Sequence, residues 1–244
     1  MAALVPAQAR AQGGLYLTWV DCAQSGNSLS NFASDCGSTD GNEELYCAFT
    51  MPQATGADVL GVIAVIDLQD SASPLPAWWH LEASGGCRSQ CATGACLTAS
   101  TDFSLVDGCV DPWHSQAVSE VQGYSIGEPR GAASQVRIKA VTGVTVEHAV
   151  SLDGTSMYYG VKLVIQNTWT SGAGVCTGCS APACLVLNSI EVVRTAGAPG
   201  GNLIIQTPGA GNMNWARWRG SADTVCGAVP VRALTWGGVK SLYR

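Results

Sequence analysis

Cysteine is the residue whose number and spacing could carry the most chemistry in this chain. Eleven cysteines occur in 244 residues, and in an oxidising compartment such a number is typical of disulfide bonds. Cys22 with Cys36, and Cys87 with Cys109, form plausible pairs, although spacing alone does not fix the connectivity. Because eleven is odd, one thiol is free or shared between chains, and Cys47, inside an expected strand, is the candidate for a buried free thiol. The ten expected to form disulfides are Cys22, Cys36, Cys87, Cys91, Cys96, Cys109, Cys176, Cys179, Cys184 and Cys226.

Zinc binding is the alternative use of these cysteines. Cys176 and Cys179 are separated by two residues, the spacing that supplies half of a zinc site. The other half would have to come from Cys87, Cys91 and Cys96, or from a distant histidine, because no second pair has this spacing. Zinc thiolates compete poorly with disulfide formation outside the cell, so the spacing favours disulfides.

Calcium is the second metal to weigh, because one acidic loop offers hard oxygen ligands. The candidate ligands are Asp35, Asp40, Asn42 and Glu44. They lack the ordered spacing of an EF-hand loop, and a solvated acidic turn is the simpler interpretation. We therefore expect no cofactor, with calcium and zinc as the open alternatives.

Tryptophan is the third chemical signal, with eight residues against three phenylalanines. Indole rings stack on the faces of sugars, so carbohydrate binding is a natural hypothesis, and packing in the core is the competing one. In an extended strand Trp78 and Trp79 would point to opposite faces, so at most one would lie in the core. His80 and His114 each follow a tryptophan and could form a metal pair or lie in loops. The candidate ligand-binding residues are Trp78, Trp79, His80, Trp113, His114, Trp215 and Trp218.

Catalytic machinery is not evident. No G-x-S-x-G motif occurs, although a Ser-His-Asp triad assembled from distant residues stays open. Glycoside hydrolysis needs two carboxylates on either side of one bond, and no motif selects a pair. The carboxylates available for it include Asp67, Glu82, Asp102, Asp107, Asp111 and Glu147.

Composition narrows the class of protein. Hydrophobic residues make up 47% and charged residues 12%, which indicates a folded chain rather than a disordered one. A net charge of −6 with only 12 Lys and Arg excludes a basic nucleic-acid-binding face. No stretch approaches the roughly 18 apolar residues of a membrane span. Met1 to Gln12 resembles the end of a signal peptide with small-x-small cleavage patterns, the alternative being a flexible N-terminus.

Alternation of apolar and polar residues predicts strands separated by Gly, Asn, Asp and Pro. Short helices are conceivable only over Ser115–Gln122 and Val239–Tyr243. Turn signals every 8–12 residues or so are typical of a sandwich or jelly roll, so we expect an all-β fold. The expected strands are 14–20, 45–51, 59–68, 135–141, 158–167, 184–193 and 203–206.

An internal repeat indicates two related halves linked by disulfides. Gly61–Asp67 aligns with Gly160–Gln166, and each segment is followed by a three-cysteine cluster. We place the boundary in Ser125–Ser134, which gives one β-sandwich or jelly-roll half over 13–127 and a second over 128–244 after a signal remnant. Coincidence between two cysteine-rich β segments is the alternative, and one larger body instead of two domains is equally open.

Several patches resemble uncharacterised, secreted, cysteine-rich β-proteins of environmental bacteria. The resemblance lies in Gly14–Cys22, Val65–Gln69 with Leu75–Trp79, Cys184–Asn188 and Thr235–Arg244. It implies export and a shared architecture, and no functional residue.

These observations favour an exported, non-catalytic β-protein for binding, adhesion or extracellular structure. Its location would be extracellular or at the cell surface. Its partner would be an extracellular glycan, a protein or a second copy of itself. The alternative is a secreted hydrolase or metal-dependent enzyme that acts on an extracellular polymer.

Overall fold

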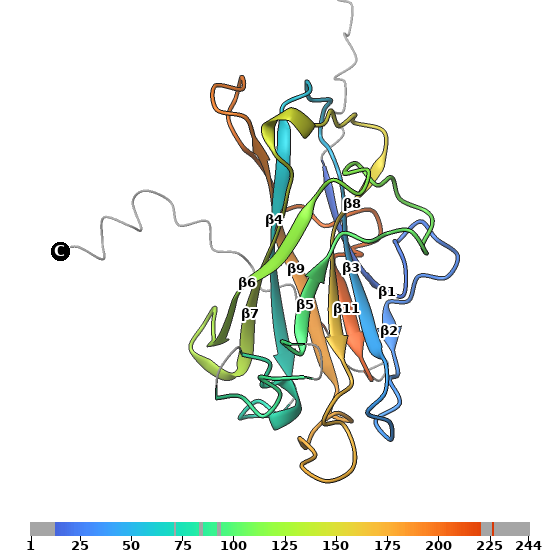
Figure 1. Cartoon of the computed structure of the whole chain (residues 1–244), viewed down its shortest axis with the longest axis vertical. Helices are drawn as coiled ribbons and strands as arrows, with labels where there is room; N and C mark the ends of the chain where they lie inside the picture. The colour runs from blue at the N-terminus through green and yellow to red at the C-terminus, as the bar shows by residue number, and fades with distance from the viewer. Residues whose placement is uncertain (1–12, 71, 83–84, 92–93, 221–225, 227–244) are drawn as a thin grey trace, which may run out of the picture.

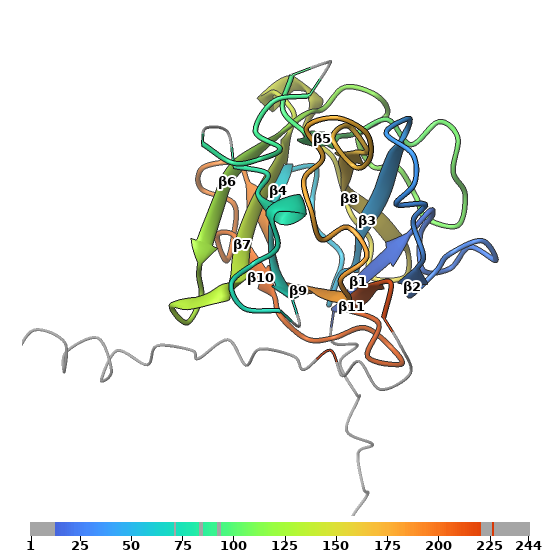
Figure 2. The same ribbon diagram turned by 90° about the horizontal axis from the view of Figure 1, so that it is seen from below.

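The chain folds into two β-sheets that face each other (Figures 1 and 2). The computed structural model describes residues 13–70, 72–82, 85–91, 94–220 and 226. Besides strands, two short 3₁₀ helices occur in this part of the chain, η1 (Ala77–Trp79) and η2 (Val146–His148). None of the described helices is long and apolar enough to span a membrane. The expectation of an all-β fold is confirmed.

The smaller sheet contains four antiparallel strands. Its order is β1 (Gly14–Trp19), β3 (Asn42–Thr50), β8 (Met157–Gln166) and β5 (Leu97–Ser100). Within β3 the five consecutive residues Leu45–Phe49 are all fully buried. The strand is therefore covered on both faces in its second half, while its first residues, from Asn42, are more exposed.

The larger sheet contains seven strands, and all but one pair are antiparallel. The parallel pair is β2 with β11. The strand β4 lies at its centre, and its residues Val62, Ala64, Ile66 and Leu68 are fully buried. The order is β2 (Asn31–Phe32), β11 (Trp215–Trp218), β9 (Ala183–Arg194), β4 (Val59–Asp70), β7 (Ala132–Gly143) and β6 (Val118–Gly127), with β10 (Leu203–Ile205) paired to β9.

Every strand expected from alternation is present within a few residues of its predicted bounds. The short helix predicted over 115–122 is wrong, because residues 118–127 form strand β6 instead. Its regular pairing with β7 outweighs the weak local preference for a helix. The other helix candidate, 239–243, lies outside the described residues, as does the expected signal remnant 1–12.

Strands from both expected halves contribute to both sheets. β3 pairs with β8, and β4 pairs with β7 and β9, so the described chain forms one two-sheet body. The stretch 125–134, expected to be a domain boundary, contains instead the connection between the paired strands β6 and β7. The two aligned repeat segments lie in different sheets, one in β4 and the other in β8.

The lower end of the sandwich in Figure 1 is closed by aromatic rings. Figure 2 shows η1 at this end, over the space between the sheets. In a 3₁₀ turn successive side chains are about 120° apart, rather than on opposite faces as in an extended strand. Trp78 and Trp79 are both fully buried. The expectation that at most one of them lies in the core is therefore wrong. They pack against Trp218, which also contacts Trp19.

Five disulfides hold loops to the sandwich, and together they use all ten cysteines expected to form them. The pairs are Cys22–Cys109, Cys36–Cys179, Cys87–Cys176, Cys91–Cys96 and Cys184–Cys226. The predicted pairs Cys22–Cys36 and Cys87–Cys109 are wrong, because the fold brings cysteines distant in sequence together. Cys47 is free and buried, as expected, and burial raises the pKa of its thiol to about 12.

Candidate functional site

Trp169 is the most exposed tryptophan among the described residues. It is 40% exposed and lies in the loop between β8 and β9. Sequence reasoning did not single it out. The available signal was its position between Asn167 and the Gly- and Ser-rich run Ser171–Gly174, where no alternating strand would bury it.

The backbone around Trp169 holds the ring in a strained conformation. Its φ of 66° lies in the left-handed region, which a bulky residue rarely adopts. The Cys176 N–H donates to the Trp169 carbonyl at 2.8 Å and closes the loop. A Cβ atom at Gly174 would lie 3.1 Å from the indole ring, so glycine allows the loop to pack closely against it. The surrounding loop thus fixes an exposed ring at a local energetic cost.

An open hollow of about 330 Å³ is lined by Ser89, Gln90, Cys91, Gly94 and Ala95. Trp169 contacts one of these lining residues, because its indole N–H donates to the backbone carbonyl oxygen of Gln90 at 2.9 Å. The exposed ring is thus attached to the loop that forms the hollow.

Two disulfides fix the walls of the hollow. Cys87–Cys176 joins the loop that follows η1 to the loop that carries Trp169, and Cys91–Cys96 closes a short ring that contains three of the lining residues. The Trp169 loop also packs closely against the start of η1 at Gly178, where a Cβ atom would lie only 2.2 Å from a Pro76 side-chain atom. These links restrict the movement of the loops that form the hollow.

The buried Arg88 side chain links the loop that follows η1 to the loop that carries Trp169. Arg88 is fully buried, and its guanidinium lies 3.9 Å from the centroid of the Trp78 ring. It donates to the carbonyl oxygens of Thr168 and Trp78, each at 3.1 Å, and also to that of Gln166. Burial lowers the pKa of this guanidinium to about 10, so it remains charged at neutral pH. These contacts join the η1 loop to the end of β8.

A second hollow, of about 200 Å³, adjoins the first through Ala95, which lines both. Its floor includes Tyr124, whose hydroxyl donates to the Trp79 carbonyl oxygen; burial raises the pKa of this phenol. The full lining is Leu81, Ala95, Leu97, Val121, Gln122, Gly123 and Tyr124.

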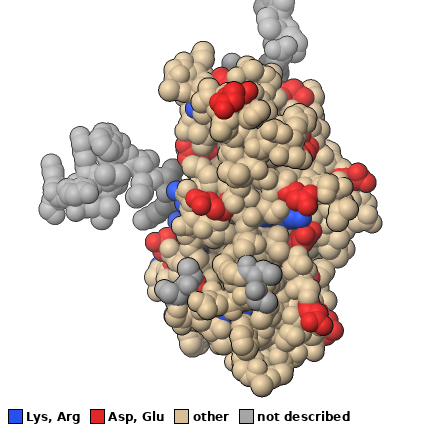
Figure 3. Space-filling model, viewed as in Figure 1, with Lys and Arg blue, Asp and Glu red and all other residues tan. Residues whose placement is uncertain are grey.

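No residue that lines either hollow, in the part of the chain that the structure describes, carries a formal charge. On the face shown in Figure 3, acidic and basic side chains lie in small separate groups between wide uncharged areas. A ligand for these hollows would therefore be recognised by stacking, apolar contact and neutral hydrogen bonds.

Most of the tryptophans proposed from the sequence cannot present a ring to a ligand. Trp78, Trp79, Trp113 and Trp218 are buried. Trp215 is half-buried, with the Arg217 guanidinium 4.7 Å from its ring centroid. The hypothesis of core packing thus holds for the buried four.

The two candidate histidines have different surroundings. His80 Nδ1 lies 3.0 Å from a Glu82 carboxylate oxygen, and its Nε2 lies 3.3 Å from the Leu75 carbonyl oxygen. His114 is exposed, with a φ of 47°. Among the described residues, no three or more His, Cys, Asp or Glu side chains come together as metal ligands.

The acidic loop proposed for calcium uses its oxygens in internal contacts. An Asp35 carboxylate oxygen accepts from the Gly37 N–H at 2.9 Å. Glu44 pairs with Lys162 at 2.9 Å and accepts from the Tyr46 hydroxyl. Asn42 begins β3 and Asp40 precedes it. Two of the four proposed calcium ligands, Asp35 and Glu44, are thus engaged in contacts within the protein.

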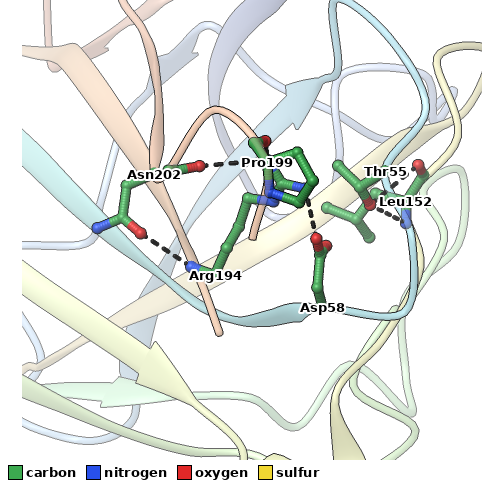
Figure 4. A network of polar contacts seen from close by, with 7 residues as sticks. Thr55, Asp58, Leu152, Arg194, Pro199 and Asn202 are labelled. Carbon is green, nitrogen blue, oxygen red and sulfur yellow. Dashed lines mark hydrogen bonds and ion pairs between the residues drawn. The ribbon is translucent and has the colours of Figure 1, made fainter. Parts of the chain in front are cut away.

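The polar cluster at the opposite end of the sandwich is a structural clamp. Figure 4 shows Arg194 between Asp58 and the β9–β10 connection. Arg194 pairs with Asp58 and donates to the Pro199 carbonyl oxygen at 2.7 Å. An Asn202 side-chain oxygen accepts from the Arg194 backbone N–H at 3.0 Å. These contacts hold the β9–β10 connection against the start of β4, although one Asp58 carboxylate oxygen and the Arg194 Nε are buried without a hydrogen-bond partner.

Comparison of the chain with protein-family models, with curated proteins and with solved structures finds no match. The candidate function therefore depends on the geometry of the site.

Proposed function

We propose that this chain is an exported, non-catalytic carbohydrate-binding protein that holds a neutral glycan at Trp169 and the adjoining hollow. The observation that carries the proposal is an exposed indole ring, fixed by a strained backbone, beside a preformed uncharged hollow. Such a protein would serve in adhesion or in an extracellular matrix.

The chemistry of the hollow complements that of a sugar. The C–H groups on one face of a pyranose ring pack against an aromatic ring, while its hydroxyl groups need hydrogen-bond partners. The side chains of Ser89 and Gln90, which line the hollow, can supply such partners. The uncharged lining favours neutral sugars over uronic acids or sulfated sugars.

Rigidity supports the same proposal. Two disulfides and the carbonyl contacts of Arg88 hold the site in place before a ligand arrives. A preorganised site loses little conformational entropy on binding, which matters for a weakly held ligand such as a sugar. Five disulfides also indicate an oxidising, extracellular environment, where glycans are the abundant polymers.

The proposal is tested by pull-down with insoluble neutral polysaccharides, namely cellulose, chitin, xylan and starch. Binding of soluble fragments is then followed by tryptophan fluorescence. We expect the wild-type protein to bind at least one polymer and Trp169→Ala to bind it at least tenfold more weakly. Trp169→Phe should retain part of the affinity, because it keeps an aromatic face.

Trp215→Ala is the matched control, since Trp215 is half-buried and lies outside both hollows. It should bind like the wild type, and thermal unfolding should show that every variant is folded. Failure of the wild type to bind any polymer, or equal binding by Trp169→Ala, would overturn the proposal. Release of soluble sugar from a bound polymer would assign the site to a hydrolase instead.

A further inference from the structure

We infer that the two hollows are neighbouring subsites of one groove that binds an extended neutral polysaccharide chain, and that Gln122 selects the unit in the second subsite. The inference rests on the proposed function and specifies its ligand as a polymer rather than a single sugar.

Proximity of the two hollows is the first support. Ala95 lines both, so the two hollows are immediate neighbours. The second hollow is lined in part by Leu97 of β5 and Val121 of β6, two edge strands that are in contact with each other. Figure 2 shows β5 and β6 at the ends of their sheets.

The sizes of the hollows support the same assignment. Pockets that hold a whole small ligand usually measure about 300 to 1,000 Å³. The second hollow, at about 200 Å³, is smaller than that range, whereas the first, at about 330 Å³, is at its lower limit. Two small adjoining hollows suit successive units of one chain better than they suit one large ligand.

A β-bulge places Gln122 at the second hollow. In the pairing of β6 with β7, Val121 opposes Ala140 and Gly123 opposes Lys139, so Gln122 is the extra residue. Bulges redirect a side chain and are common beside functional sites. Gln122 is exposed and lines the hollow, and its amide can both donate to and accept from sugar hydroxyls.

The neighbours of Gln122 complete a subsite suited to a sugar unit. Gly123 adds no side chain, and the nearest atom to a Cβ built there lies 3.9 Å away, so the absence of one keeps the groove open. Leu81, Leu97 and Val121 supply apolar walls, and Tyr124 is anchored from below by its bond to Trp79. The bulge also interrupts the backbone ladder of this edge strand, which disfavours addition of a peptide strand.

The test uses oligosaccharides of one to six units from the polymer that the wild-type protein retains. Affinity is measured by isothermal titration calorimetry. For the wild type we expect affinity to rise about tenfold from one unit to the length that spans both subsites, and then to level off. Gln122→Ala should bind the single unit like the wild type but lose most of the gain with length. Trp169→Ala should bind every length weakly.

Gln116→Ala is the matched control, because Gln116 is exposed and lines neither hollow; it should retain the full gain with length. If affinity is the same for one unit and for six, or if Gln122→Ala keeps the gain, the inference is wrong while a Trp169-dependent proposed function survives. If the wild type binds no sugar, the proposed function itself fails. If a neutral extended peptide displaces the oligosaccharides, the groove binds a peptide and the inference is wrong.

Discussion

The two ends of the sandwich are held together by different means. At the lower end in Figure 1, long connections without strands follow β4 and β8, and disulfides tie them to each other and to the sandwich. At the upper end the connections are shorter, and the ion pair and hydrogen bonds of Arg194 hold them. None of the five described disulfides joins the upper connections 51–58, 144–156 and 195–202, while Cys22–Cys109 holds the longer connection between β5 and β6.

The difference follows from the cost of ordering a chain. A long irregular loop loses more conformational entropy on folding than a hairpin does, and it has fewer backbone hydrogen bonds to offset that loss. A covalent link removes part of the loss by restricting the unfolded chain. The lower end, where the long loops are held by disulfides, also carries Trp169 and the two hollows. The disulfides that offset the entropy loss of these loops therefore also make the site rigid.

Of the changes proposed here, removal of the Cys87–Cys176 disulfide should lower the free energy of unfolding most. Cys87 and Cys176 are 89 residues apart, so Cys87→Ser with Cys176→Ser should lower the free energy of unfolding by about 4 to 5 kcal/mol in the chain-entropy model. Cys91 and Cys96 are only 5 apart, and the matching double variant should cost about 2 kcal/mol. Guanidinium unfolding measures both, and equal losses would contradict the entropic account.

Asp58→Asn should have a smaller and more local effect at the opposite end. It weakens the ion pair with Arg194, whose side chain is 8% exposed, and should cost about 1 to 2 kcal/mol. Amide hydrogen exchange should become faster in β10 and at the end of β9. The Cys176 amide should exchange as slowly as it does in the wild type. Glu191→Gln, which changes one exposed contact with Asn202, is the control with little effect. Faster exchange around Trp169 as well would show that the two ends are coupled.

Asp70→Asn should have the smallest effect, visible only as a dependence on pH. Burial raises the pKa of the Asp70 carboxyl at the lower end of β4. A raised pKa in the folded state means that the stabilising contribution is present below the unfolded value, about 3.9, and is lost as pH rises through the folded value. Asparagine removes this loss, so the variant should gain stability relative to the wild type at pH 7 and not at pH 3. Urea midpoints at the two pH values measure the gain, and an equal gain at both would exclude titration as its cause.

Local patterns were sufficient for most strands and insufficient for the site. The nearly continuous apolar run 59–68 and the largely apolar segment 184–193 predict β4 and β9, because a short apolar run bounded by turn residues is typical of a buried strand. The helix predicted over 115–122 fails because its pairing with β7 is a contact that no local window contains. Trp78 and Trp79 show the same limit, since a single 3₁₀ turn places both in the core.

Two properties were determined by the sequence itself: an all-β fold, and the participation of ten cysteines in disulfides with Cys47 left buried and free. Each depends on composition or on local patterns of apolar residues. The tertiary structure alone decided which cysteines pair, that strands from both expected halves share each sheet, and that Trp169, among the described tryptophans, exposes its ring and contacts the loop that forms a hollow. These features depend on which distant segments meet, and that is set by the packing of the whole sandwich.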